Sequence, residues 1–211
     1  MARGTGSMRV RIVYPDVTTF SLTDAYGVSR EYLVDGRYLA ISLGALTFSP
    51  LNDVATPWEN KRVVGFTALG RILDTVQMNQ IAQDGVTVLE SNAPFIKVRH
   101  GLTTNMTNVL TKTPTVIQIA DEMQIRTRDT LQPFVGVKYL PALFSQMEGR
   151  LNMMFKRAVA EQLITSYTGI SVTADPSDPT GALVEGYFVP VFPLIYIKVQ
   201  FFLRSQSSAA A

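Results

Sequence analysis

Apolar residues recur along this chain at two spacings, one typical of helices and one typical of strands. The clearest helical pattern follows Pro141, where an apolar stripe repeats every three or four residues and polar residues fill the opposite side. Proline suits the first helical position, because the N–H that it lacks would have no helical partner there. We therefore predict a long amphipathic helix in residues 141–163, with an apolar stripe of Phe144, Met147, Leu151, Met154, Phe155 and Ala158 opposite Gln146, Arg150 and Arg157.

Three further stretches have a weaker helical pattern. The first begins at about Gly36 and is closed by Pro50, and residues 49–65 then read as an ordered loop. The second begins at Thr67 and stops near Gly85, and its apolar face would consist of Leu69, Ile72, Leu73 and Val76.

The third stretch carries Val116, Ile119, Ala120, Met123 and Leu131 and ends around Pro133. Glu122 and Arg126 lie one turn apart in the order that favours an ion pair. Asp121 and Glu122 would also suit the start of the helix, where the helix dipole favours negative charge.

Alternating apolar and polar residues predict strands at both ends of the chain and in its middle. Residues 8–14 form one candidate strand, and residues 85–90 and 93–99 form two more around a turn at Ser91 and Asn92. After Gly169 we predict three strands, over residues 170–174, 182–191 and 193–204, with Pro190 and Pro193 making a bend or a sheet edge. The fold class is therefore α+β, with helices packed on mixed sheets and C-terminal antiparallel strands.

Composition narrows the range of functions. The chain has 211 residues, which suffice for one domain or two small ones, and 17% of them are charged. Together with a mean hydropathy of +0.15, this low charge suggests a surface partly hidden against copies of the same chain. The net charge of +2 is too small to imply nucleic acid or a membrane surface as a partner. Cysteine is absent, and no segment has the roughly 18 consecutive apolar residues of a membrane helix.

His100, the only histidine, is the first candidate for catalysis. It is followed by Gly101, Thr103 and Thr104, but no acid nearby in the sequence would orient it as a catalytic base. A structural histidine at the end of a strand is the favoured interpretation, and a small hydrolase using His100 with a remote carboxylate is the remote alternative. Gly101 stands alone, so the loop lacks the glycine spacing of a phosphate cradle.

Asp175 and Asp178 are the only candidate metal ligands. A calcium loop needs several oxygen ligands at short alternating spacing, whereas two aspartates, each followed by proline, favour chained turns. We predict no metal, no cofactor and no catalytic residue. Arg150 and Arg157 could address an acidic partner, although a solvated helix face is the favoured interpretation of such a pair.

The order of several stretches resembles the contractile tail sheath proteins of bacteriophages. These stretches are "DGRYLAISLGALTFSPLNDVATPWENKRVVGF", "QMNQIAQDGVTVLE", "VRHGLTTN", "RTRDTLQPFVGVKYLPALFSQMEGRLNMMF" and "GISVTADPSDPTGALVEGYFVPVFPLIYIKVQFFL". The resemblance covers residues 8–204. Family members usually carry a substantial first half before the first of these stretches, so the resemblance predicts a part of a sheath protein or an unusually short one.

The resemblance implies a structural subunit that polymerises around a tail tube and contracts to drive the tube through the bacterial envelope. It implies that residues 8–112 are part of the core domain and that residues 113–204 form a C-terminal, tube-facing domain. From their composition, residues 1–7 are expected to be a disordered leader or cloning remnant, and residues 205–211 a disordered tail. Expected partners are further copies of the chain, the tail tube, the baseplate and the tail terminator, in a virion tail assembled in the bacterial cytoplasm. A sheath of a bacterial injection system, such as a pyocin or a type VI secretion system, is the alternative.

The same resemblance assigns two groups of contact residues. Arg150 and Arg157 are expected to contact an acidic tube surface. The strand that links neighbouring subunits, or completes the sheet of one of them, is expected to comprise Leu194, Ile195, Tyr196, Ile197, Lys198, Val199, Gln200, Phe201, Phe202 and Leu203.

Overall fold

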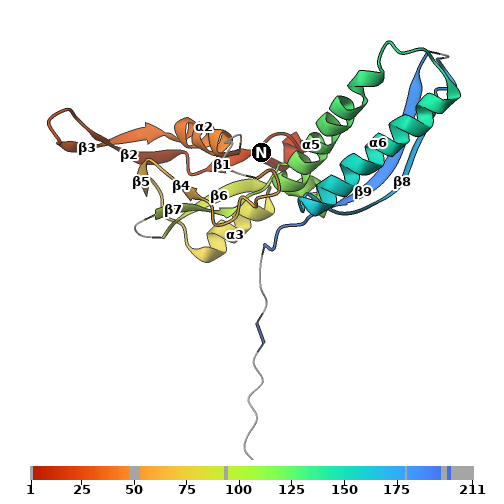
Figure 1. The fold of residues 1–211 in the computed structure, drawn as a ribbon. Coiled ribbons are helices and arrows are strands. Elements are labelled where there is room, and N and C mark those ends of the chain that lie inside the picture. Colours follow the sequence, from red (N-terminus) through yellow and green to blue (C-terminus); the bar gives the residue numbers. More distant parts are fainter. Residues whose placement is uncertain (1, 48–52, 93–94, 179, 196–198, 201–211) are drawn as a thin grey trace, which may run out of the picture.

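A computed structural model describes residues 2–47, 53–92, 95–178, 180–195 and 199–200 of the chain. The elements, in chain order, are α1 (Ala2–Thr5), β1 (Ile12–Tyr14), β2 (Val17–Thr23), β3 (Ser29–Asp35), α2 (Gly36–Thr47), β4 (Arg62–Val63), β5 (Phe66–Leu69), α3 (Thr75–Gln83), β6 (Val86–Asn92), β7 (Phe95–His100), α4 (Val109–Lys112), α5 (Pro114–Leu131), the 3₁₀ helix η1 (Gln132–Phe134), α6 (Pro141–Ala160), β8 (Ile164–Ala174) and β9 (Ala182–Pro190). The molecule is elongated, with the β2–β3 hairpin at one end and the α5–α6 connection at the other (Figure 1).

The first lobe, residues 2–112, is built on two sheets. One sheet has the strand order β1-β6-β7-β4, in which β1 runs parallel to β6, and the other has the order β3-β2-β5. Helix α2 contacts β1, β2 and β3, and buries Leu39 and Leu43. The core of this lobe consists of Leu39, Leu43, Trp58, Val63, Leu89, Ile96 and Val98.

The second lobe, residues 113–190, packs two helices against one hairpin. Helix α6 contacts α5 on one side and β8 on the other, and β8 pairs antiparallel with β9. The predicted stripe is confirmed, because Met147, Leu151, Phe155 and Ala158 are buried while Gln146, Arg150 and Arg157 are exposed. Burying a large apolar side chain of this kind stabilises a fold by about 1.5–3 kcal/mol relative to leaving it in water.

Apolar packing and an ion pair join the lobes. Trp58 belongs to the core of the first lobe, while the neighbouring Val54 and Ala55 pack against Ile119 and its cluster in the second. The Arg9 guanidinium donates two hydrogen bonds to Asp121, at 2.7 and 2.6 Å. The prediction that Asp121 and Glu122 lie near a helix start is therefore wrong, since α5 begins at Pro114 and Asp121 binds Arg9 from the middle of the helix. The predicted pair of Glu122 with Arg126 is confirmed at 2.7 Å.

The helix predicted from Thr67 is wrong in its first part. Phe66–Leu69 form β5, which pairs with β2. The helix begins only at Thr75, because the Asp74 carboxylate accepts a hydrogen bond from the Gln77 N–H at 2.8 Å and the Gln77 side chain accepts one from the Asp74 N–H at 3.3 Å. Pairing with a strand about 50 residues earlier thus overrides the local apolar spacing.

Several predicted boundaries also shift. The strand predicted over residues 8–14 is confirmed only over Ile12–Tyr14, and the predicted turn residues Ser91 and Asn92 lie in β6, paired with Ile96 and Phe95 of β7. In the predicted leader, Ala2–Thr5 form a helical turn and Ser7 exchanges two hydrogen bonds with Thr104, at 3.1 and 2.8 Å.

The last predicted strand falls partly outside the described residues. β9 ends at Pro190, and Leu194, Ile195, Val199 and Gln200 belong to no strand of this chain. Residues 196–198 and 201–203, and the predicted tail at 205–211, lie outside the described residues. The α+β fold class is confirmed. None of the helices in the described part of the chain is long and apolar enough to cross a membrane.

Candidate interaction surfaces

His100, at the end of β7, has the surroundings of a structural residue. Its Nε2 atom lies 3.2 Å from Oδ1 of Asn79, an amide. Among the described residues, its hydrogen-bond partners include neither a carboxylate nor a hydroxyl group that could act as a nucleophile. Burial lowers the pKa of His100, and the positive charge of Arg99 lowers it further against the opposing effect of Glu90. The arrangement gives no pair of groups for acid–base or nucleophilic chemistry.

The loop after His100 is held by its own hydroxyl groups. Thr103 is fully buried, and its Oγ1 donates to the Thr111 carbonyl at 2.6 Å and accepts from the Asn105 N–H at 3.2 Å. Gly101 is required here by packing, because a Cβ atom on it would lie 2.6 Å from Cβ of Trp58. The residues HGLTTN therefore close the first lobe against Trp58.

Asp175 and Asp178 form the chained turns that the sequence predicts. The Asp175 carboxylate accepts from the Ser177 N–H and hydroxyl at 2.8 and 2.6 Å, and Asp178 accepts from the same two groups of Thr180 at 2.8 and 2.7 Å. These hydrogen bonds lower the pKa of both aspartates. Within the described residues, no group of three or more histidines or acids is arranged to hold a metal ion.

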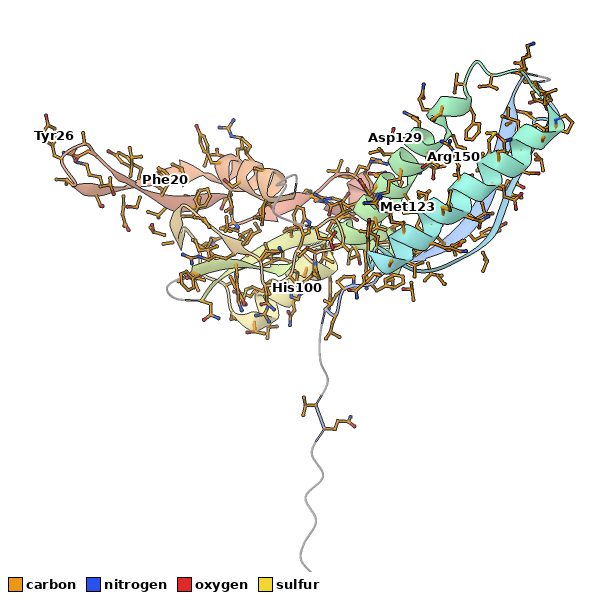
Figure 2. The ribbon with its side chains drawn as sticks, viewed as in Figure 1. Phe20, Tyr26, His100, Met123, Asp129 and Arg150 are labelled. Carbon is orange, nitrogen blue, oxygen red and sulfur yellow. The ribbon has the colours of Figure 1, made fainter. Side chains whose placement is uncertain are left out.

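Arg150 and Arg157 lie on the exposed side of α6 but differ in their contacts. Arg157 donates to Glu161 at 2.7 Å, and Glu161 also binds Arg126. The hydrogen bonds from Arg126 and Arg157 lower the pKa of Glu161. The Arg150 guanidinium lies 5.2 Å from the Phe134 ring and has no acidic partner among the described residues (Figure 2). Arg150 is thus the better placed of the two for an acidic partner.

The hairpin of β8 and β9 leaves a groove at its side. In the described chain β9 pairs only with β8, so its other edge has no strand beside it. An open groove of about 490 Å³ lies between α5 and β9, and Met123 of α5 is one of its wall residues (Figure 2). The groove is lined by Met123, Gln124, Thr127, Arg128, Phe155, Ile170, Val184, Glu185, Gly186 and Phe188. An unpaired strand edge next to apolar side chains is a binding site for an extended segment.

Two further exposed surfaces were not among those predicted from the sequence. Between α5 and α6, Val135, Val137, Tyr139 and Leu140 are exposed at the far end of the second lobe. At the opposite end, the β2–β3 hairpin projects from the first lobe with Tyr26 at its tip, 93% exposed. An alternating pattern on both sides of the turn signal DAYG would have revealed the hairpin. Exposed apolar groups at both ends are typical of a protein with binding partners.

Comparison with solved structures assigns the fold. The chain superimposes on the helical sheath of the anti-feeding prophage in its contracted state, with a TM-score of 0.75 and 13% identity over 94% of this chain and 57% of that one. It superimposes on a sheath tail protein of Desulfitobacterium hafniense with a TM-score of 0.66 and 10% identity, over 90% of this chain and 47% of that one. This chain therefore has the fold of part of a contractile sheath protein.

Sequence comparison points to the same class of protein. Over 209 residues the chain is 22% identical to the tail sheath protein of Mycobacterium phage Bxz1. The aligned residues cover 98% of this chain and 35% of that protein. No family model matches the chain. The chain thus spans about a third of the length of its curated relative and about half of each solved sheath chain. The resemblance to contractile tail sheath proteins that was predicted from the sequence is confirmed.

Proposed function

We propose that this chain is a structural part of a contractile tail sheath, which polymerises around a tail tube and contracts to drive the tube through the bacterial envelope. The fold shared with sheath proteins and the similarity to a phage tail sheath protein support this proposal. Such a role needs no catalytic residue or cofactor. Among the described residues, the side-chain hydrogen bond of the His100 imidazole is to the amide of Asn79.

The single observation that carries the proposal is the incomplete sheet of the second lobe. The edge of β9 faces an open groove, while the alternating segment of residues 194–203 lies beyond the last strand of its own chain. A segment with this alternation supplies apolar side chains to one face and backbone groups to a sheet edge. We therefore infer that residues 194–203 of one copy pair with β9 of a neighbouring copy.

Strand exchange of this kind suits a contracting polymer. The exchanged strand keeps neighbours attached while each folded body rotates and slides as a unit. The packing of Val54 and Ala55 against the second lobe, and the ion pair of Arg9 with Asp121, support movement of the body as one piece. Contraction then releases free energy when the lattice passes from a metastable extended state to a more stable one.

The proposal also assigns outside partners. Arg150, with no acidic partner in the described part of the chain, is the main candidate for contact with an acidic tube surface, and Arg157 is the second. Baseplate and tail terminator proteins would meet the ends of the sheath, and assembly would occur in the bacterial cytoplasm before the virion forms.

A bacterial injection system is the second candidate for the assembly that contains this chain, because the solved sheath of the anti-feeding prophage has this fold. Neighbouring genes for a capsid and a terminase would favour a phage, and a gene for a sheath-recycling unfoldase would favour secretion.

Deletion of residues 194–204 tests the proposed link. The deletion should abolish assembly with the tail tube, seen by negative-stain electron microscopy, while circular dichroism stays unchanged because the described residues of this segment pair with no strand of their own chain. Deletion of residues 205–211 is the matched control and should leave assembly intact. Sheaths of ordinary length from the chain without residues 194–204 would contradict the proposal.

A substitution at His100 separates the structural role from the remote hydrolase alternative. His100→Ala removes the only imidazole of the chain, so a hydrolase that depends on it would lose turnover. A sheath subunit should still assemble with its tube, with at most a small loss of stability. Hydrolytic activity that disappears in His100→Ala would contradict the structural assignment.

A further inference from the structure

A polar pocket in the first lobe is not used by the proposed sheath contacts. It lies where the start of α3 meets strands β5, β6 and β7, and it has a volume of about 270 Å³. Its polar walls are Tyr14, Arg71, Glu90, Ser91, Asn92 and Arg99, and Leu69, Ile72, Leu73, Thr75, Met78 and Leu89 complete the lining. We name it the Arg71 pocket. Its residues come from six separate elements or loops, so the fold itself brings the polar groups together.

Two hydrogen-bonding atoms of this pocket are buried without a partner. The Tyr14 hydroxyl oxygen and Nε of Arg99 are both shielded from solvent, and neither has a hydrogen-bond partner among the described residues. Folded proteins pair nearly all such atoms, because an unpaired buried donor costs about 1–3 kcal/mol. Two unpaired donors in the lining of one pocket point to an acceptor group from outside the chain.

The charges around the pocket favour an anion. Glu90 binds Arg99 at 2.6 Å and Lys97 at 3.1 Å, and both cations are thereby directed to a single carboxylate. Burial opposes ionisation of Glu90, but the hydrogen bonds from Arg99 and Lys97 outweigh it and lower its pKa. Arg71 is exposed and has no acidic partner among the described residues. Among the lining residues, Arg71 and Arg99 therefore face one carboxylate, that of Glu90, and the lining carries one excess positive charge.

We propose that the Arg71 pocket binds a carboxylate group. Arg71 would supply a guanidinium that can donate two parallel hydrogen bonds. The Tyr14 hydroxyl and Arg99 Nε, which solvent does not reach, would donate to the carboxylate after a rotamer change of the side chains that cover them. The size of the pocket suits a side chain or a small organic acid. Ile72, 82% exposed, lines the pocket, so methylene groups next to the carboxylate have an apolar contact.

The carboxylate has two sources, a free small acid or an Asp or Glu side chain of a second copy of the chain. Both use the same donors. The inference does not rest on the sheath function, because a pocket with these donors binds a carboxylate whether or not the chain polymerises. Failure of assembly would thus leave this inference intact, and failure of carboxylate binding would leave the sheath proposal intact.

Titration with succinate tests the pocket on the full chain. Calorimetry should detect saturable binding above that of sodium chloride at the same ionic strength, and arginine Nε–Hε resonances in NMR spectra should shift. Arg71→Ala should weaken binding about tenfold, since it removes a charged donor of two hydrogen bonds, and Tyr14→Phe should weaken it about fivefold, since it removes one hydrogen bond to a charged group. Arg30→Ala, which removes an exposed arginine from β3 near the hairpin tip, should bind as the unaltered chain does.

The outcomes separate as follows. Absence of succinate binding, or equal binding by Arg71→Ala and the unaltered chain, would overturn the proposal and leave the pocket to water. If succinate binds, analytical ultracentrifugation distinguishes the two sources. Self-association that succinate and Arg71→Glu both reverse supports a side chain of a second copy, whereas binding without any effect on association supports a free acid. Circular dichroism confirms that each variant is folded.

Discussion

The two lobes differ in how completely each satisfies its own strands. In the first lobe β2, β6 and β7 each pair with strands on both sides, and one buried cluster joins α2, Trp58 and the larger sheet. Among the described residues of the second lobe, the sheet has two strands, and a groove opens beside β9. The first lobe therefore resembles a finished domain, whereas the second leaves backbone groups available to another segment.

This difference has a functional meaning. A sheet edge left open next to apolar side chains invites unwanted association unless a specific segment covers it. Under the proposed function, the neighbouring copy provides that segment, and the open edge becomes the link of the polymer. The first lobe then serves as part of the rigid body that the link moves.

The largest expected effect concerns the core of the second lobe. Leu151 is 0% exposed on α6 and belongs to the cluster with Met147 and Val172, so Leu151→Ala should lower the free energy of unfolding by about 3 kcal/mol. Urea denaturation measures the change. Met153→Ala on the same helix is the control, because Met153 is 64% exposed and should be nearly neutral. Equal effects of the two variants would mean that α6 does not bury the stripe described above.

The next effect concerns the packing of the first lobe. A methyl group on Gly101 would lie 2.6 Å from Cβ of Trp58, so Gly101→Ala should destabilise the chain by about 2 kcal/mol. Fluorescence of Trp58, the only tryptophan, reports the local change during denaturation. An unchanged midpoint and emission spectrum would show that the loop has room to move away.

A glycine of the second lobe should behave in the opposite way. Gly149 lies on the exposed side of α6, and nothing is found within 4 Å of the position that a Cβ atom would take. Gly149→Ala should therefore stabilise the chain by about 1 kcal/mol, because alanine favours the helical backbone. A higher denaturation midpoint with unchanged assembly is the expected result. Loss of stability would indicate a close neighbour at this face.

The smallest effect is a dependence on pH. The pKa of folded His100 lies below its ordinary value, so the unfolded chain binds a proton first as the pH falls. Stability is therefore fully present above the ordinary histidine pKa of about 6.5 and decreases as the pH falls from there toward the folded value. His100→Gln should show a weaker decrease in this range, measured by urea denaturation at pH 7, 6 and 5. The same slope in both proteins would contradict the burial of the imidazole.

Much of the second lobe could be predicted from the sequence, and much of the first could not. The stripe on α6 and the turns at Asp175 and Asp178 arise from neighbours in the sequence, and both predictions are confirmed. The β2–β3 hairpin was missed although its strands are neighbours in the sequence. Strand β5 was predicted as helix because it is fixed by pairing with β2, a partner far away along the chain. Local spacing carries no information about such a partner.

The candidate surfaces divide in the same way. The sequence predicts Arg150 and Arg157 on the exposed side of one helix, but only the structure distinguishes Arg157, bound to Glu161, from Arg150. The alternation in residues 194–203 predicts a strand but not its partner. The groove beside β9 and the Arg71 pocket each depend on residues from several elements, so no sequence motif marks them.

Amide hydrogen exchange along β9 tests the account most directly, because it reports whether another segment covers that edge. The chain is compared in its dispersed form and assembled on the tail tube, and exchange in residues 182–190 is followed by mass spectrometry. We predict slower exchange in the assembled form, with the slow exchange absent when residues 194–204 are deleted. Equal exchange of β9 in the dispersed and assembled forms would contradict the account, because the edge would then remain uncovered in the polymer.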